Sequence, residues 1–68
     1  MNARAIALSC FGLDISIVRA LRDEAAQAGD SVIIADCDSI IDVGPDGEPD
    51  ARACRSVEQA IADARAQG

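Results

Sequence analysis

The sequence predicts a small all-α domain, in which three helices form a bundle after an irregular or short helical N-terminal arm. Three observations support this fold class. Three segments repeat apolar residues at the three- and four-residue spacing of a helix face. A short polar residue precedes each segment, and glycine follows the first and the last. The length of 68 residues allows a single domain, residues 1–68, with a thin core.

The first helix is expected to begin near Asp14 and to end before Gly29. Asp14 or Ser16 can cap its start, because a short side-chain oxygen accepts a hydrogen bond from a free backbone N–H of the first turn. Gly29 suits the left-handed residue that ends a helix, and Asp30 can cap the next helix. This pair therefore predicts the turn of a helical hairpin. The expected buried face consists of Ile17, Val18, Leu21, Ala25 and Ala28.

The second helix is expected over residues 31–42. This segment is rich in β-branched residues and also alternates as a strand would. A strand, however, would place Val32, Ile34 and Ile40 on the face that carries the aspartates, whereas a helix separates isoleucine from aspartate. The alternative fold is α+β, in the order β-α-β-β-α, with residues 4–10 and 31–43 as strands. The expected apolar face of the helix consists of Ile33, Ile34, Cys37, Ile40 and Ile41.

Residues 43–50 are expected to form a loop, because two prolines and two glycines prevent a helix from continuing. Asp50 can cap the third helix. Before residue 14 the chain is predicted to be a short helix or an extended arm, and Phe11 and Leu13 are expected to fold back onto an alanine-rich core. The apolar stripe of the third helix consists of Ala53, Cys54, Val57, Ala60, Ile61 and Ala64.

The composition excludes several kinds of chemistry. The chain contains no His, Lys, Trp or Tyr, and Phe11 is its single aromatic residue. Histidine catalysis, histidine-bound metals and P-loops are thereby excluded, and single-stranded nucleic acid has no aromatic platform to stack on. The three cysteines are an odd set without a C-x-x-C pair, which favours reduced thiols and a cytoplasmic location. We therefore predict no enzyme activity, no cofactor and no metal site.

The distribution of charge points to the kind of partner. The net charge is −6, and residues 23–51 carry nine acidic residues and no basic one. A field of one sign attracts basic surfaces and repels nucleic acid. We predict a basic protein partner, such as a nucleic-acid-binding complex, and no direct contact with nucleic acid or membrane. The predicted partner-binding residues are Asp36, Asp38, Asp42, Asp46, Glu48 and Asp50.

Two other interpretations of these acidic residues stay open. Arg19, Arg52 or Arg55 can neutralise them across the fold, or they can form a solvated face that keeps a small protein in solution. Residues 32–40 also resemble the nucleophile strand of haloacid-dehalogenase-type phosphatases, with Asp36 and Asp38 as the D-x-D. That family needs a downstream lysine, which this chain lacks. The acidic loop after residue 42 lacks most ligand positions of an EF-hand.

A second resemblance covers residues 17–67. It is carried by the segments 21–30 (LRDEAAQAGD), 37–38 (CD), 51–54 (ARAC) and 61–65 (IADAR). These segments resemble short acidic proteins of phages and proteobacterial mobile elements, whose pattern is approximately L-R-x-E-A-x-x-A-G-D. The resemblance implies a helical fold and a mobile-element origin, and it supplies no site residues.

These features together predict a non-enzymatic interaction protein. Its most specific form is a phage-type inhibitor of the anti-CRISPR kind, which binds a nucleic-acid-binding host protein by mimicking nucleic-acid charge. The alternative is a structural or assembly module that forms a homo-oligomer, such as a homodimer through alanine-rich helix faces. A third class is a metal- or thiol-dependent regulator that uses Cys10, Cys37 and Cys54.

Overall fold

The structure of the chain is a computed structural model that describes residues 2–68, and this part forms four helices and no strand. The helices are α1 (Ala3–Ser9), α2 (Ile15–Ala28), α3 (Ser31–Asp42) and α4 (Ala51–Gln67). The predicted all-α class and the short helical arm are therefore confirmed. The α+β alternative is wrong, because its proposed strands, residues 4–10 and 31–43, form α1 and α3 with their C-terminal caps.

Each helix begins at a side-chain cap. Oδ1 of the capping residue accepts a hydrogen bond from a backbone N–H two or three residues further on, at 2.9 to 3.2 Å. Such a cap contributes about 1 kcal/mol to the stability of a helix. Asp14 rather than Ser16 caps α2, so this helix starts before its first fully buried residue, Val18. The four caps are Asn2, Asp14, Asp30 and Asp50.

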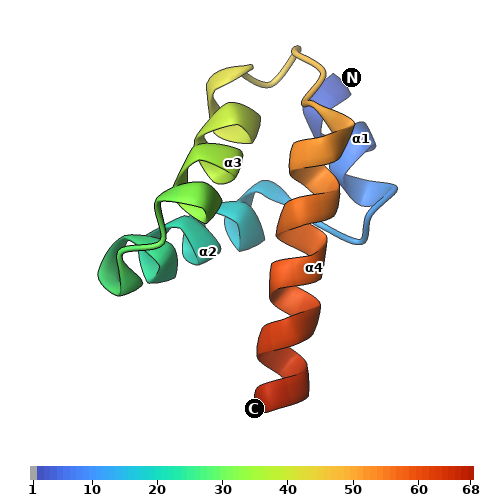
Figure 1. Cartoon of the computed structure of the whole chain (residues 1–68). Helices are drawn as coiled ribbons and strands as arrows, with labels where there is room; N and C mark the ends of the chain where they lie inside the picture. The colour runs from blue at the N-terminus through green and yellow to red at the C-terminus, as the bar shows by residue number, and fades with distance from the viewer. Residues whose placement is uncertain (1) are drawn as a thin grey trace.

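The predicted hairpin of α2 and α3 is present, and the two helices lie side by side (Figure 1). Gly29 ends α2 with a φ of 71°, and its backbone N–H donates to the carbonyl oxygens of Ala25 and Ala26. A side chain at this φ would be strained, which is why glycine stands here. The hairpin brings α3 into the middle of the fold, with α2 on one side of it and α4 on the other.

The N-terminal half of α4 packs against α3, whereas α4 and α2 meet in few places. The C-terminal half of α4 runs past the rest of the bundle (Figure 1). Burial along the apolar stripe of α4 follows this geometry. Val57 is fully buried, Ile61 is half-buried and Ala64 is exposed.

The core lies where α1, α2, α3 and α4 converge. Leu8 of α1 and Leu13 are buried in it, and Phe11 packs against it half-buried, so the predicted folding-back of the N-terminal segment is found. The predicted burial of Ala28 and Ala64 is wrong: both residues are exposed, each in the last turn of its helix. The buried cluster consists of Leu8, Leu13, Val18, Cys37, Ile40, Ala53, Cys54 and Val57.

Candidate functional site

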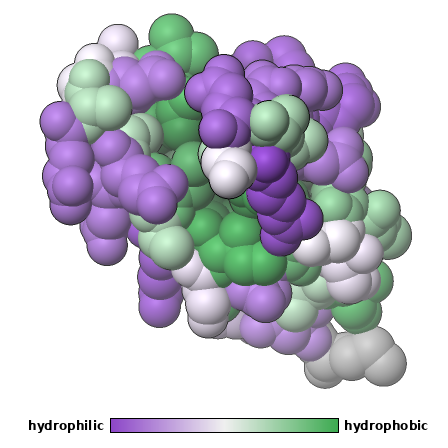
Figure 2. Space-filling view, turned by 90° about the horizontal axis from the view of Figure 1, so that it is seen from below, coloured by the Kyte–Doolittle hydropathy of each residue, from purple (hydrophilic) through white to green (hydrophobic). Residues whose placement is uncertain are grey.

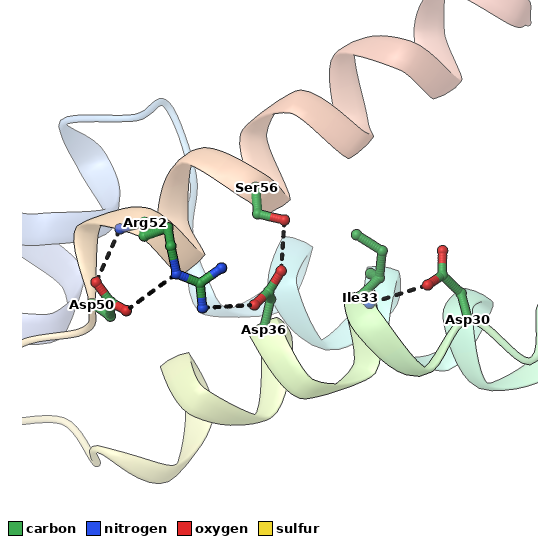
Figure 3. A network of polar contacts seen from close by, with 6 residues as sticks. All are labelled: Asp30, Ile33, Asp36, Asp50, Arg52 and Ser56. Atoms are coloured by element: carbon green, nitrogen blue, oxygen red, sulfur yellow. Dashed lines mark hydrogen bonds and ion pairs between the residues drawn. The ribbon is translucent and has the colours of Figure 1, made fainter.

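The six acidic residues predicted to bind a partner do not share one surface. Asp36 is buried between α3 and α4, with 6 % of its surface exposed. The Ser56 hydroxyl of α4 donates to Asp36 Oδ2 at 2.6 Å, and the Arg52 guanidinium lies 3.6 Å from Asp36 Oδ1 (Figure 3). The expectation that Asp36 lies on an exposed face is wrong, because α3 packs against α4 as well as α2. Asp36 therefore joins two helices and is withdrawn from solvent.

Asp38 is half-exposed and is paired with Arg22 of α2. Arg22 Nε donates a hydrogen bond to Asp38 Oδ1. This hydrogen bond, together with the charge of the carboxylate, raises the pKa of Arg22. Arg22 and Asp38 each stand eight residues from Asp30, at the turn of the hairpin, so the antiparallel geometry sets them opposite one another.

Arg22 was not among the arginines that the sequence suggested as neutralising residues. Of those three, Arg52 forms ion pairs, with Asp36 and Asp50. Arg19 and Arg55 are exposed, and within residues 2–68 neither makes a salt bridge. The symmetry of the hairpin about its turn is the signal by which Arg22 could have been found.

The remaining four acidic residues are exposed and lie at one end of the molecule, where α3 passes into α4. We call this surface the acidic end; it consists of Asp42, Asp46, Glu48 and Asp50. Asp50 caps α4, and its Oδ2 lies 3.9 Å from Arg52 Nε. The other three carboxylates accept no hydrogen bond and form no salt bridge within the described part of the chain.

Arg4 of α1 holds the loop that carries the acidic end in place. Arg4 is buried, its NH1 donates to the carbonyl oxygen of Ile41 at 2.8 Å, and its backbone N–H donates to the carbonyl oxygen of Pro45 at 3.1 Å. A cation also complements the negative C-terminal end of α3. The burial of Arg4 could not be predicted from the sequence, because nothing about an arginine among alanines indicates that it is buried.

The loop itself is tightly folded. A Cβ atom added to Gly47 would collide with the carbonyl oxygen and the Cβ of Val43, so only glycine fits there. Pro49, close to the start of α4, is buried. The loop backbone therefore packs closely against Val43 and α1, and the acidic side chains project from it.

The three cysteines are not placed as reactive groups of one site. Cys37 and Cys54 are buried in the core, and Cys10 is exposed. Burial, with a further contribution from Asp36 and Asp38, raises the pKa of Cys37 to about 11, and burial also raises the pKa of Cys54. A neutral, buried thiol is a poor nucleophile and a poor metal ligand. Among residues 2–68, no three Cys, Asp or Glu side chains come together as a possible metal site.

The D-x-D motif at Asp36 and Asp38 lies on a helix rather than at the end of a strand. One aspartate is bonded to α4 and the other to α2, so the two carboxylates point to different neighbours. They cannot converge on one phosphate, and the motif has no catalytic geometry.

An apolar groove lies between α2 and the C-terminal half of α4. The main hollow has a volume of about 310 Å³, and a second of about 210 Å³ adjoins it near Phe11. The two hollows adjoin, since both are lined by Ile17, Ile61 and Arg65; the first is mainly apolar and the second is mixed in character. Figure 2 shows hydrophobic side chains gathered in the middle of the lower face of the molecule, framed by hydrophilic ones. The main hollow is lined by Ile17, Ala20, Leu21, Glu24, Ile61, Ala64 and Arg65.

Comparison of the chain with protein-family models, with curated proteins and with solved structures finds no match. The resemblance to mobile-element proteins stays a prediction. No helix within residues 2–68 has the length and apolar character needed to span a membrane.

Proposed function

We propose that this chain is a non-enzymatic interaction protein whose acidic end binds a basic protein surface. The observation that carries the proposal is the contrast between bonded and unbonded carboxylates. Asp36 and Asp38 are bonded to neighbouring helices, whereas Asp42, Asp46 and Glu48 are exposed without a cationic partner in the described part of the chain. Three unneutralised carboxylates on one small surface favour a cationic partner.

The rigidity of the loop supports the same function. Binding costs less conformational entropy when the groups that bind are already held in place. Arg4, Gly47 and Pro49 fix the loop before any partner arrives.

The more specific form of the proposal is competition with nucleic acid. Duplex DNA carries one charge per about 1.7 Å of its axis, and a basic groove built for it also accepts closely spaced carboxylates. In this form the chain, like the anti-CRISPR inhibitors that act by charge mimicry, occupies the groove of a nucleic-acid-binding host protein. The partner then binds either the acidic end or its nucleic acid, and never both.

The test is retention of basic proteins from a host lysate on the immobilised chain at low and at high salt. Asp46→Lys combined with Glu48→Lys reverses two charges of the acidic end without touching the cap residue Asp50 or any hydrogen bond. We expect the wild type to retain a basic nucleic-acid-binding protein at low salt and to release it at high salt. The variant should retain little of it under either condition.

The matched control is Asp23→Lys combined with Asp63→Lys. Both residues are exposed, they lie on α2 and α4, and the control has the same net charge as the test variant. If the control loses the partner to the same extent, net charge rather than the acidic end determines binding. If the Asp46→Lys, Glu48→Lys variant binds as the wild type does, the proposed function is wrong.

The second candidate function is an assembly module that pairs with its own copy. The apolar groove between α2 and α4, at the opposite end of α4, favours it. The two functions use different surfaces, and one does not exclude the other.

A further inference from the structure

We infer that the groove between α2 and α4 is a homodimer interface, in which a second copy of this chain covers the uncovered C-terminal half of α4. Along α4 the apolar pattern of the sequence and the burial of the side chains do not match. The apolar stripe continues at helical spacing through Val57, Ile61 and Ala64, but Val57 is fully buried, Ile61 is half-buried and Ala64 is exposed. Apolar surface left in contact with water costs about 25 cal/mol per Å² relative to burial.

The opposite wall of the groove has the same character. Ile17 and Leu21 of α2 are half-buried, and Ala20 is exposed beside them. The groove is thus apolar along its floor and on both walls, while Glu24 and Arg65 stand at its edge. A floor of this kind with charged residues at its rim has the composition of a protein–protein interface.

The signs of the rim charges favour a second copy over a partner of one sign. Glu24 lies on the α2 wall and Arg65 on the α4 wall, and Glu58 borders the adjoining hollow. In a two-fold symmetric dimer the same patch meets itself, so an acidic rim residue of one copy can pair with a basic rim residue of the other. This rim supplies both signs, and rotation by a two-fold axis can bring Glu24 of one copy towards Arg65 of the other.

The distribution of the net charge permits such a dimer despite the value of −6 per chain. The acidic end lies at the N-terminal end of α4 and the groove beside its C-terminal half (Figure 1). A helix of 17 residues is about 25 Å long, and charges are screened over about 8 Å at physiological salt. Two copies that meet at their grooves therefore keep their acidic ends apart, and both ends stay free for another partner.

Sedimentation equilibrium from about 1 µM to about 1 mM tests the inference on the full chain. We expect a reversible monomer–dimer equilibrium for the wild type. Ala64→Glu places a charge in the groove at an exposed helix position, so the monomer fold should be unchanged and dimerisation should weaken at least about tenfold. The control is Ala66→Glu, the same substitution two residues further along α4, at an exposed position that does not line the groove.

A charge exchange tests the pairing of the two copies. Glu24→Arg alone and Arg65→Glu alone should each weaken dimerisation, whereas the double variant should regain it, since it restores opposite charges with the wild-type net charge. Circular dichroism of each variant shows that the helices are intact. A wild type that stays monomeric at the highest concentration overturns the inference, and so does a dimer that Ala64→Glu leaves unchanged. A monomer that binds the acidic-end partner would leave the proposed function standing, so the two failures are distinguishable.

Discussion

The two ends of α4 differ in how completely their side chains are bonded or buried. At the N-terminal end, Arg52 and Ser56 bond to the buried Asp36, and Arg4 fixes the neighbouring loop. Every buried side-chain nitrogen and oxygen in residues 2–68 has a partner. At the C-terminal end, apolar side chains such as Ile61 are only half-covered and lie along an open groove. Polar contacts thus hold one end together, while the other end is apolar and only partly covered.

The largest expected effect is on the free energy of unfolding. It is tested by the same isoleucine-to-alanine substitution at two positions. Ile40→Ala removes a fully buried side chain beside the rigid end, and it should lower the free energy of unfolding by about 3 kcal/mol. Ile61→Ala removes a half-buried side chain from the groove, and it should cost the monomer about 1 kcal/mol or less. Urea unfolding at low protein concentration measures both. Equal losses would contradict the difference in packing between the two ends.

The next effect concerns the buried carboxylate. Asp36→Ala removes the partner of Ser56 and one partner of Arg52, so we expect a loss of about 2 kcal/mol in the free energy of unfolding. Asp63→Ala is the control, because Asp63 is exposed and accepts its hydrogen bond from Gln59 of the same helix. It should change stability by less than about 0.5 kcal/mol. If Asp36→Ala left the free energy of unfolding unchanged, the α3–α4 contact would not depend on this network.

Gly47→Ala tests the rigid loop. The added methyl group would collide with Val43, so the loop must shift, at an expected cost of about 1 kcal/mol. The shift should also weaken retention of the basic partner, although no carboxylate is removed. Asp46→Ala in the same loop is the stability control, since its side chain is exposed. Unchanged stability and unchanged partner binding in Gly47→Ala would mean that the loop need not be held in this conformation.

The last effect is absent at neutral pH and appears only in alkali. The thiol of Cys37 has its pKa raised from 9.0 to about 11 in the folded chain. Below pH 9 the thiol is neutral in both states. Between pH 9 and 11 the unfolded state loses its proton first, so the free energy of unfolding should fall as pH rises. The chain contains no Lys or Tyr, so neither of these side chains adds to the slope in this range.

Urea unfolding in reductant from pH 8 to 11 measures this slope. Cys37→Ala should flatten it in part, because Cys54, whose pKa is also raised, still contributes. The slope and not the absolute stability is compared, because Cys37→Ala also leaves a cavity. A slope that Cys37→Ala does not alter would contradict the burial of this thiol.

Local signals determined most of the fold. Residues 31–42 were predicted as a helix and form one with the same bounds, because apolar spacing and the cap at Asp30 agree. The tight turn at Gly29 followed from the same kind of signal. Burial was predicted less well. A single helix pattern shows one buried face, but α3 has helices on two sides, and the second neighbour buries Asp36 at the edge of the apolar face.

The candidate site was predictable only in part, for the same reason. Asp42, Asp46, Glu48 and Asp50 lie in or beside a loop, so their exposure follows from the local sequence. The symmetry of the hairpin indicates Arg22 as the partner of Asp38. The partners of Asp36 depend on contacts between α3 and α4 that no short-range pattern specifies. The groove could not be predicted either, because it depends on how α2 and the C-terminal half of α4 are placed relative to each other.

The most direct test that the two ends bind different partners is to measure both kinds of binding for a variant of each end. Asp46→Lys, Glu48→Lys and, separately, Ala64→Glu are each measured for retention of the basic partner and for self-association. We expect the first variant to lose the partner and keep the dimer, and the second to lose the dimer and keep the partner. If either variant abolishes both, or if the acidic-end variant retains the partner, the two surfaces do not act separately and the account is contradicted.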